Sequence, residues 1–239
     1  ILDCTLRDGS YVVDFGFTAG DTIDLYCRLA NLGFPYIEIG HGIGLGASAK
    51  GMGVAAASDR EYMEAIWGQH KFGYPDAKWG MFAIPGIASL DDIDLAAKFT
   101  MGFLRIGCEV ADVENAKPFI ERARHHGIYV FSNLMKSYAA PVEEFVAAAL
   151  TCIEYGAQCV YIVDSAGGML PSEIQAYAHP LRMAWPDVRL GFHGHNNLGL
   201  GVANALDCAN MGFDVIDTSL QGLGRSGGNV PTEQFLAAL

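Results

Sequence analysis

The segment His193-Gly194-His195 carries the clearest chemical signal in this sequence. Residues two positions apart on a strand project to the same side, so both imidazoles can reach one point. Gly194 leaves room for that approach. Two histidines and one carboxylate suit a divalent metal ion with open coordination positions. Asp8 is the candidate carboxylate, and the alternative is that the histidines only pack and form hydrogen bonds.

Arg7 and Asp8 stand side by side where an early apolar run ends, and Gly9 and Tyr11 follow them. Consecutive residues of a regular strand point to opposite faces. If Arg7 and Asp8 serve one site, the chain must turn between them, and Gly9 is predicted to permit that turn.

The elements that must position these residues alternate along the chain. Short apolar runs and amphipathic segments repeat eight times, which predicts parallel strands joined by helices. Eight such units predict one domain over 1–239, a (β/α)8 TIM barrel with the active site at the carboxyl ends of its strands. An open doubly wound sheet is the alternative. The expected strands are 1–5, 36–40, 79–84, 103–107, 128–133, 159–164, 189–193 and 215–219.

Helix boundaries follow from local residue types. Residues 58–61 match a capping box, in which Ser58 and Glu61 are predicted to begin a helix that extends through Trp67. Asp112 is predicted to cap another helix, and Pro141 and Gly156 are predicted to begin and end a third. The final helix is expected to be cut short.

Closure of the barrel would bring the metal-binding candidates together. The first and seventh strands both neighbour the eighth in a closed barrel, so Asp8 can approach the two histidines. Glu38 is expected to pair with Arg7 or Arg105. Residues 42–53 are predicted to form a lid or substrate-contact loop. Residues 222–228 lie where barrels often bind phosphate, with a plain turn-rich connection as the alternative.

Composition narrows the class of protein. The net charge of −12 and the absence of a basic stripe argue against nucleic-acid binding. The six cysteines are scattered without a C-x-x-C pair, which argues against a zinc ribbon or a disulfide scaffold. No apolar stretch has the ~20 residues that span a bilayer, and no signal peptide is visible. We expect a cytoplasmic protein whose sequence begins within a trimmed first strand.

Three motifs together resemble one enzyme family. "DCTLRDG", "HGHNNLGLGVANAL" and "GLGRSGGNVPTE" are similar to motifs of the metal-dependent aldolase, lyase and Claisen-condensing barrels, the HMG-CoA lyase-like family. "IEIGHGIGLGAS", "KSYAAPVEEF" and "CVYIVDSAGGM" resemble its 4-hydroxy-2-oxovalerate aldolase branch. The resemblance implies a class II pyruvate aldolase that cleaves, or forms, a 4-hydroxy-2-oxo acid. Manganese is the expected metal, with magnesium, cobalt or zinc as alternatives.

The resemblance also implies residue roles. Asp8, His193 and His195 match the metal ligands, and Asn229 matches a position that ligates metal in some lyases of the family. Arg7 matches an arginine that stabilises the pyruvate enolate, and Ser165 matches a serine near the pyruvate carboxylate. His41 and Tyr138 are further candidate substrate contacts.

Two positions depart from the aldolase pattern, since Tyr11 and Tyr138 stand where aldolases carry histidines. Tyr11 is a candidate catalytic group if its pKa is lowered; otherwise a metal-bound hydroxide or His41 takes the proton, or Tyr11 only shapes the pocket.

The alternatives to an aldolase are a Claisen-type acyltransferase or acyl-CoA lyase, and a barrel with a binding or scaffold role. The sequence leaves open whether the protein forms a homo-oligomer. No dehydrogenase partner is expected, because the family's docking region is absent from this sequence.

Overall fold

The computed structural model describes all 239 residues and contains a closed barrel of parallel strands. The strands run in chain order around the barrel, and β1 pairs with both β2 and β8. This arrangement confirms the predicted (β/α)8 TIM barrel. The strands are β1 (Leu2–Asp3), β2 (Tyr36–Glu38), β3 (Lys78–Ala83), β4 (Phe103–Glu109), β5 (Tyr129–Met135), β6 (Cys159–Asp164), β7 (Leu190–Gly194) and β8 (Val215–Thr218).

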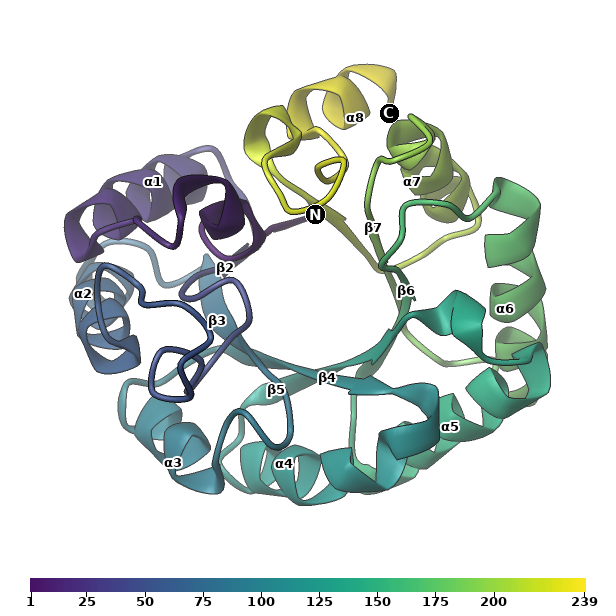
Figure 1. Cartoon of the computed structure of the whole chain (residues 1–239), viewed down its shortest axis with the longest axis horizontal. Helices are drawn as coiled ribbons and strands as arrows, with labels where there is room; N and C mark the ends of the chain where they lie inside the picture. The colour runs from purple at the N-terminus through teal and green to yellow at the C-terminus, as the bar shows by residue number, and fades with distance from the viewer.

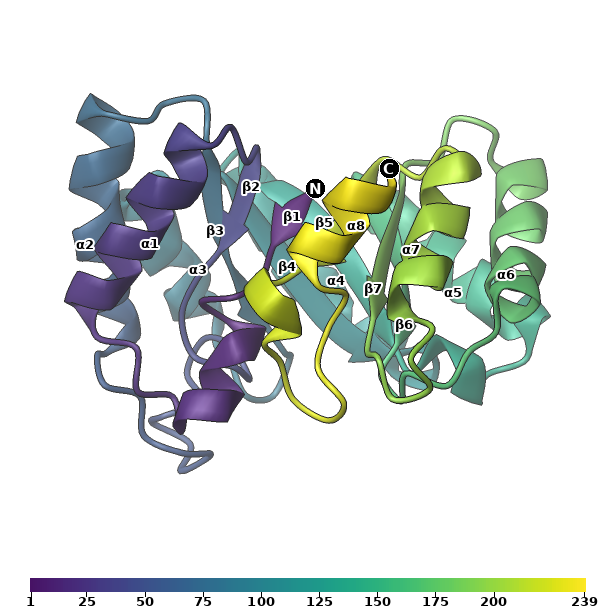
Figure 2. The same cartoon turned by 90° about the horizontal axis from the view of Figure 1, so that it is seen from above.

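Helices form an outer ring around the strands (Figure 1). The last helix, α8, has only 7 residues and lies between α1 and α7 (Figures 1 and 2). The helices are α1 (Ala19–Asn31), α2 (Asp59–Phe72), α3 (Leu90–Lys98), α4 (Val113–His125), α5 (Val142–Tyr155), α6 (Pro171–Ala184), α7 (Gly201–Asn210) and α8 (Thr232–Ala238). Four short 3-10 helices are η1 (Asp8–Val13), η2 (Val110–Asp112), η3 (Ser137–Ala139) and η4 (Leu220–Gly222).

Local sequence explains several helix ends. Ser58 and Glu61 form the predicted capping box, with both reciprocal hydrogen bonds present. Gly156 ends α5 with a φ of 111°, which confirms its role as a terminator. The prediction for Asp112 is wrong in detail, because its side chain makes no capping bond and a 3-10 turn leads into α4. Pro141 stands one residue before the first helical position.

The barrel interior divides into an apolar floor and a polar upper end. The floor is a separate buried cluster of aromatic, aliphatic and thiol side chains. Above it, buried charged side chains fill the carboxyl end of the barrel. The floor therefore closes the barrel below the polar residues and directs them towards the loops. Its members include Leu2, Cys4, Phe103, Phe131, Cys159 and Tyr161.

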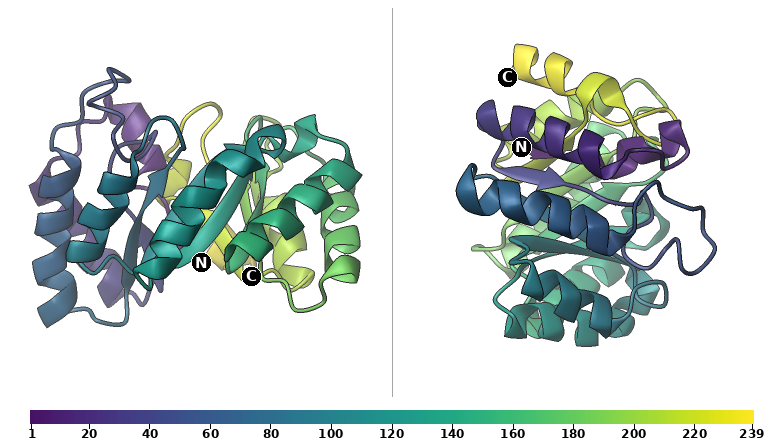
Figure 3. Two further views of the ribbon diagram at one scale, coloured as in Figure 1. Left: turned by 90° about the horizontal axis from the view of Figure 1, so that it is seen from below. Right: turned by 90° about the vertical axis from the view of Figure 1, so that its left-hand side faces the viewer.

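The loops that follow the strands gather at one end of the barrel. The segments after β1 and β8 project towards this end in Figure 2. Residues 42–53 extend beyond it in both views of Figure 3. No helix combines the length and apolar character that a membrane crossing requires.

Candidate metal centre and active site

The three predicted metal ligands meet at the carboxyl end of the barrel. The ligand atoms of Asp8, His193 and His195 all lie within 4.8 Å of one another, and the three residues are buried. The two imidazole centroids are 5.1 Å apart, with ring planes at 89°. The structure therefore brings together residues from the first and the seventh strand–loop units in a set able to hold a metal ion.

Strand order and a glycine place these ligands. β8 pairs with both β1 and β7, so the loop after β1 lies near the end of β7. A Cβ atom on Gly194 would lie 2.5 Å from Cζ of Phe192. The His-Gly-His segment therefore needs a residue without a side chain at its centre.

Hydrogen bonds orient both histidines. Nδ1 of His193 donates to Oδ2 of Asp217 over 2.8 Å, and Nδ1 of His195 donates to the carbonyl oxygen of Gly228 over 3.3 Å. Each assignment leaves the Nε2 lone pair available to a cation, as metal-binding histidines require. Burial lowers the pKa of both imidazoles, which favours the neutral form that binds metal.

A buried network of ion pairs links the two sides of this site. Arg7 donates to Asp8 and Glu38, each over 2.8 Å. Arg105 donates to the same Glu38 oxygen over 2.8 Å and also to Asp217. Glu38 thus pairs with both arginines that the sequence offered as partners. The network runs from the ligand Asp8 to the carboxylate that orients His193.

The charge balance of this network fits a cation. Three carboxylates face two guanidinium groups, so the buried cluster carries one uncompensated negative charge when its histidines are neutral. Oδ2 of Asp8 is buried and has no hydrogen-bond partner. Burial tends to raise the pKa of Asp8, but nearby positive charge, to which Arg7 contributes most, holds the pKa below its usual value. An ionised, unpartnered carboxylate oxygen beside two imidazole nitrogens matches the donor set of a divalent metal site.

The turn between Arg7 and Asp8 exists, but its cause differs from the prediction. Arg7 caps η1, which begins at Asp8, so a 3-10 turn redirects the chain. Gly9 does not have a positive φ. A Cβ atom on Gly9 would lie 3.2 Å from Cβ of Leu223, so the glycine serves close packing against the loop after β8.

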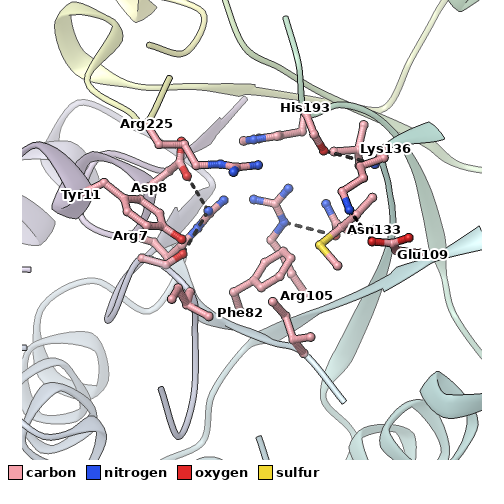
Figure 4. Close-up of a pocket in the computed structure, with 16 residues that line it drawn as sticks. Arg7, Asp8, Tyr11, Phe82, Arg105, Glu109, Asn133, Lys136, His193 and Arg225 are labelled. Carbon is pink, nitrogen blue, oxygen red and sulfur yellow. Dashed lines mark hydrogen bonds and ion pairs between the residues drawn. The ribbon is translucent and has the colours of Figure 1, made fainter. Parts of the chain in front are cut away.

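A cavity of about 260 Å³ opens above the ion-pair network (Figure 4). It combines Arg7 and Arg105 with two of the metal-binding candidates, Asp8 and His193, and its size suits a small organic acid. Phe82 forms part of its wall, with its ring 5.0 Å from the guanidinium carbon of Arg7. The lining residues are Arg7, Asp8, Tyr11, Gly42, Ile43, Phe82, Ile84, Arg105, Glu109, Asn133, Met135, Lys136, Val163, Ser165, His193 and Arg225.

Tyr11 is half-buried in η1 and lines this cavity. Its ring packs edge-on against Phe15 at 5.2 Å, and Gly42 gives it space. Burial raises the pKa of Tyr11, and the nearby Arg7 charge only partly opposes this. The phenol is therefore protonated at neutral pH in the protein without bound metal.

His41 and Tyr138 do not line the cavity. Nδ1 of His41 accepts a hydrogen bond from the Ile43 amide over 3.1 Å, and its ring stacks on Phe15 at 4.0 Å. Tyr138 is exposed on η3, where Lys136 has a φ of 52° and turns the chain away. The sequence placed both residues after the correct strands but could not show the direction of their side chains.

Ser165 belongs to the cavity wall, and Asn229 lies beside His195, with which it forms an isolated bridge. Ser165 lines the cavity, and its hydroxyl accepts a hydrogen bond from the Lys136 amide over 3.1 Å. Asn229 donates to the Leu223 carbonyl over 3.0 Å, while its own carbonyl oxygen Oδ1 is buried without a partner.

Sequence reasoning missed Asp217. Its carboxylate joins Arg105 to His193, although these residues are far apart in the chain. The available signal was an acidic residue inside the apolar run of β8, where a buried charge requires partners.

The fold and the site define a class of protein: a (β/α)8 barrel enzyme with a two-histidine, one-carboxylate centre at the carboxyl ends of its strands. The model of the HMGL-like family matches residues 1–239. The chain belongs to this family, and it is an enzyme of the carbon–carbon lyase type.

Relatives of known name agree with this assignment. The chain is 40% identical to an oxaloacetate decarboxylase of Mycobacterium tuberculosis, covering 100% of this chain and 69% of the relative. It is 39% identical to 4-hydroxy-2-oxovalerate aldolase 2 of Nocardia farcinica, covering 100% of this chain and 67% of the relative. The HMG-CoA lyase structure from Brucella melitensis shares the fold, with a TM-score of 0.81 at 20% identity over 100% of this chain and 88% of that one.

Proposed function

We propose that this enzyme is a class II pyruvate aldolase, which cleaves a 4-hydroxy-2-oxo acid to pyruvate and an aldehyde. The observation that carries the proposal is the position of Arg7 beside Asp8 in one small cavity, with His193 in the same wall. Relatives named as 4-hydroxy-2-oxovalerate aldolases support this type of substrate. We therefore expect a small-molecule 2-oxo acid to bind in this cavity as the substrate.

Asp8, His193 and His195 are proposed to hold the metal, with the free oxygen of Asn229 as a candidate fourth ligand. The family resemblance makes Mn²⁺ the proposed ion, with Mg²⁺, Co²⁺ or Zn²⁺ as alternatives. When bound, the ion would act as a Lewis acid that withdraws electron density from the 2-oxo group.

Arg7 is proposed to stabilise the charge that develops during cleavage. The C3–C4 bond breaks, its electron pair forms the C2–C3 double bond, and negative charge collects on the enolate oxygen. The Arg7 guanidinium stays protonated, because Glu38 and Asp8 raise its pKa more than burial lowers it. Two oxygens of the substrate can accept hydrogen bonds from such a group. Ser165 is proposed to bind the substrate carboxylate.

Tyr11 is proposed to move the proton that cleavage requires. The reaction removes one proton from the 4-hydroxyl and adds one to C3, so the two transfers balance. In a concerted relay the phenol oxygen takes the 4-hydroxyl proton as its own proton passes to C3, so the group starts and ends as a neutral phenol. Its raised pKa is compatible with this relay role, which does not need a standing phenolate.

Metal-dependent release of pyruvate tests the proposal. The purified protein would be stripped with a chelator, reloaded with Mn²⁺, and incubated with 4-hydroxy-2-oxovalerate while pyruvate is measured. Activity that disappears with the metal and returns with it is expected. Absence of pyruvate from the metal-loaded protein, with any 4-hydroxy-2-oxo acid, would overturn the aldolase proposal.

Decarboxylation of oxaloacetate is the second candidate. The relative at 40% identity carries that name. Loss of carbon dioxide also forms a pyruvate enolate, but no hydroxyl proton has to be removed. A protonated Tyr11 would then only donate a proton to C3. Comparison of pyruvate release from oxaloacetate and from 4-hydroxy-2-oxovalerate separates the two candidates, and thioester dependence would reveal the Claisen-type alternative.

A further inference from the structure

Arg225 is the one cationic side chain of the cavity lining that has no ion-pair partner in the protein. Arg7 and Arg105 are paired in the buried network, and Lys136 is paired with Glu109. The Arg225 side chain forms neither a salt bridge nor a hydrogen bond, and Figure 4 shows its guanidinium group pointing into the cavity. A free guanidinium group in a small-molecule pocket is available to an anionic group of the ligand.

The backbone around Arg225 is held in place. The Gly228 amide donates to the Arg225 carbonyl oxygen over 3.0 Å, and the Asn197 side chain donates to the Ser226 hydroxyl over 2.6 Å. Gly224 is in close contact with Asn229, since a Cβ atom there would lie 2.4 Å from Nδ2 of Asn229. The loop that carries Arg225 is therefore anchored to segments of the site, which reduces the ordering cost of ligand binding.

Arg225 lies on the side of the cavity that contains Tyr11. Figure 4 shows both residues at the edge of the cavity that also carries Asp8, and the Arg225 charge acts against the effect of burial on the Tyr11 pKa. In the proposed reaction, Arg7 and Ser165 bind the 2-oxo acid end, and Tyr11 serves the 4-hydroxyl. A substituent on C4 would then lie within the field of Arg225.

We propose that Arg225 binds a second carboxylate on C4 of the substrate, so that the preferred substrates are 4-hydroxy-2-oxo dicarboxylic acids and the aldehyde product is itself an acid. This inference rests on the proposed aldolase function. It also disfavours the decarboxylase candidate. A guanidinium group that holds the carboxylate lost as carbon dioxide would stabilise the ground state more than the transition state.

Binding of two unreactive ligands tests the inference without catalysis. 2-Oxoglutarate and 2-oxopentanoate differ only in a terminal carboxylate or methyl group. Calorimetry on the Mn²⁺-loaded protein is expected to show about tenfold tighter binding of 2-oxoglutarate, as one charge-assisted hydrogen-bonded pair at an exposed site can supply. Arg225→Gln should remove the preference, and Arg225→Lys should retain part of it.

Arg28→Gln is the matched control, because it removes the same charge from an exposed arginine in the last turn of α1, which pairs with Asp24. The control should keep the wild-type preference. Equal losses for both ligands in Arg225→Gln would overturn the inference, since Arg225 would then contact the shared 2-oxo acid end.

Kinetics with a second matched pair separates this inference from the function on which it rests. 4-Hydroxy-2-oxoglutarate and 4-hydroxy-2-oxovalerate differ by a carboxylate or a methyl group on C4. Arg225→Gln should lower kcat/KM about tenfold more for the dicarboxylate. Pyruvate release without this difference would reject only the role of Arg225. Selective binding without pyruvate release would reject only the aldolase function.

Discussion

Asp217 and His193 form a hydrogen bond of 2.8 Å that connects the metal-binding set to the buried arginines. The same Asp217 oxygen accepts from Arg105, so one carboxylate fixes both the imidazole and the guanidinium group. Asp217→Asn should weaken metal binding, because the amide lacks the charge that increases the basicity of His193. We expect a loss of about 10- to 100-fold in Mn²⁺ affinity by calorimetry.

Asp214→Asn is the control for this change, since Asp214 is an exposed aspartate just before β8. Circular dichroism should show that both variants are folded. An unchanged Mn²⁺ affinity in Asp217→Asn would mean that Asp217 pairs with Arg105 but does not influence metal binding.

Tyr11→Phe isolates the hydroxyl group, because the ring contact with Phe15 and the close packing against Gly42 can persist. Removal of a proton-transfer group typically lowers rates by roughly 10²- to 10⁴-fold. We expect a fall of this size in kcat for cleavage of a 4-hydroxy-2-oxo acid. A variant as fast as the wild type would show that Tyr11 only shapes the pocket.

Tyr11→His would supply a base of lower pKa at the same position. An imidazole with a pKa near 6.5 is largely neutral at pH 8 and can accept the hydroxyl proton directly. We expect kcat to exceed that of Tyr11→Phe at least tenfold at pH 8, and to fall below about pH 6.5 as the ring becomes protonated. A pH–rate profile identical to that of the phenylalanine variant would contradict the proposed position of the 4-hydroxyl.

Gly194→Ala should destabilise the fold through a steric clash. The added methyl group would approach the Phe192 ring to 2.5 Å, and overpacking of this kind costs about 1–3 kcal/mol. Denaturant unfolding monitored by fluorescence measures the change. Gly168→Ala is the control, because no atom lies within 4 Å of the added methyl there. Equal stability of the two variants would show that Phe192 moves aside freely.

Asp3 should make stability depend on pH. Burial raises its pKa to about 7, and the hydrogen bonds from Thr5 only partly oppose this rise. A carboxyl group with a raised pKa stabilises the folded state below its unfolded pKa of about 4, and the stabilisation is lost as pH rises towards 7. Asp3→Asn should therefore flatten the pH dependence of the unfolding free energy between pH 4 and 7.

Chemical denaturation at several pH values measures this effect, which is on the order of a few kcal/mol across the interval. The exposed Asp76→Asn provides a control that should keep the wild-type slope. The same slope in Asp3→Asn and in the wild type would assign the pH dependence to other groups.

Much of the fold was predictable because its signals are local. Each strand is an apolar run, and residues such as Ser58 and Gly156 mark helix ends through their own backbone and side-chain preferences. The meeting of Asp8 with the two histidines followed from the closed strand order alone.

Other features depended on contacts between distant segments. Asp217 has partners in β4 and β7, and nothing adjacent to it in the sequence indicates either. His41 was expected near the substrate, but Phe15, with a φ of 58°, stacks on its ring. Side-chain direction in loops depends on such individual backbone angles, which residue type does not specify.

The pairing of β1 with β8 also constrains the order in which the enzyme can mature on the ribosome. The Cys4 thiol donates a hydrogen bond to the carbonyl oxygen of Thr218, which lies 214 positions later in the chain. Asp8 depends on the same closure of the barrel to reach the histidines. Domains emerge from the ribosome amino end first, so the first strand must remain unpaired on one side until the eighth has been translated. A nascent chain that stops before β8 lacks both an intact sheet and a reaction centre. A chain without β8 therefore leaves one edge of β1 unpaired and open to pairing with another chain.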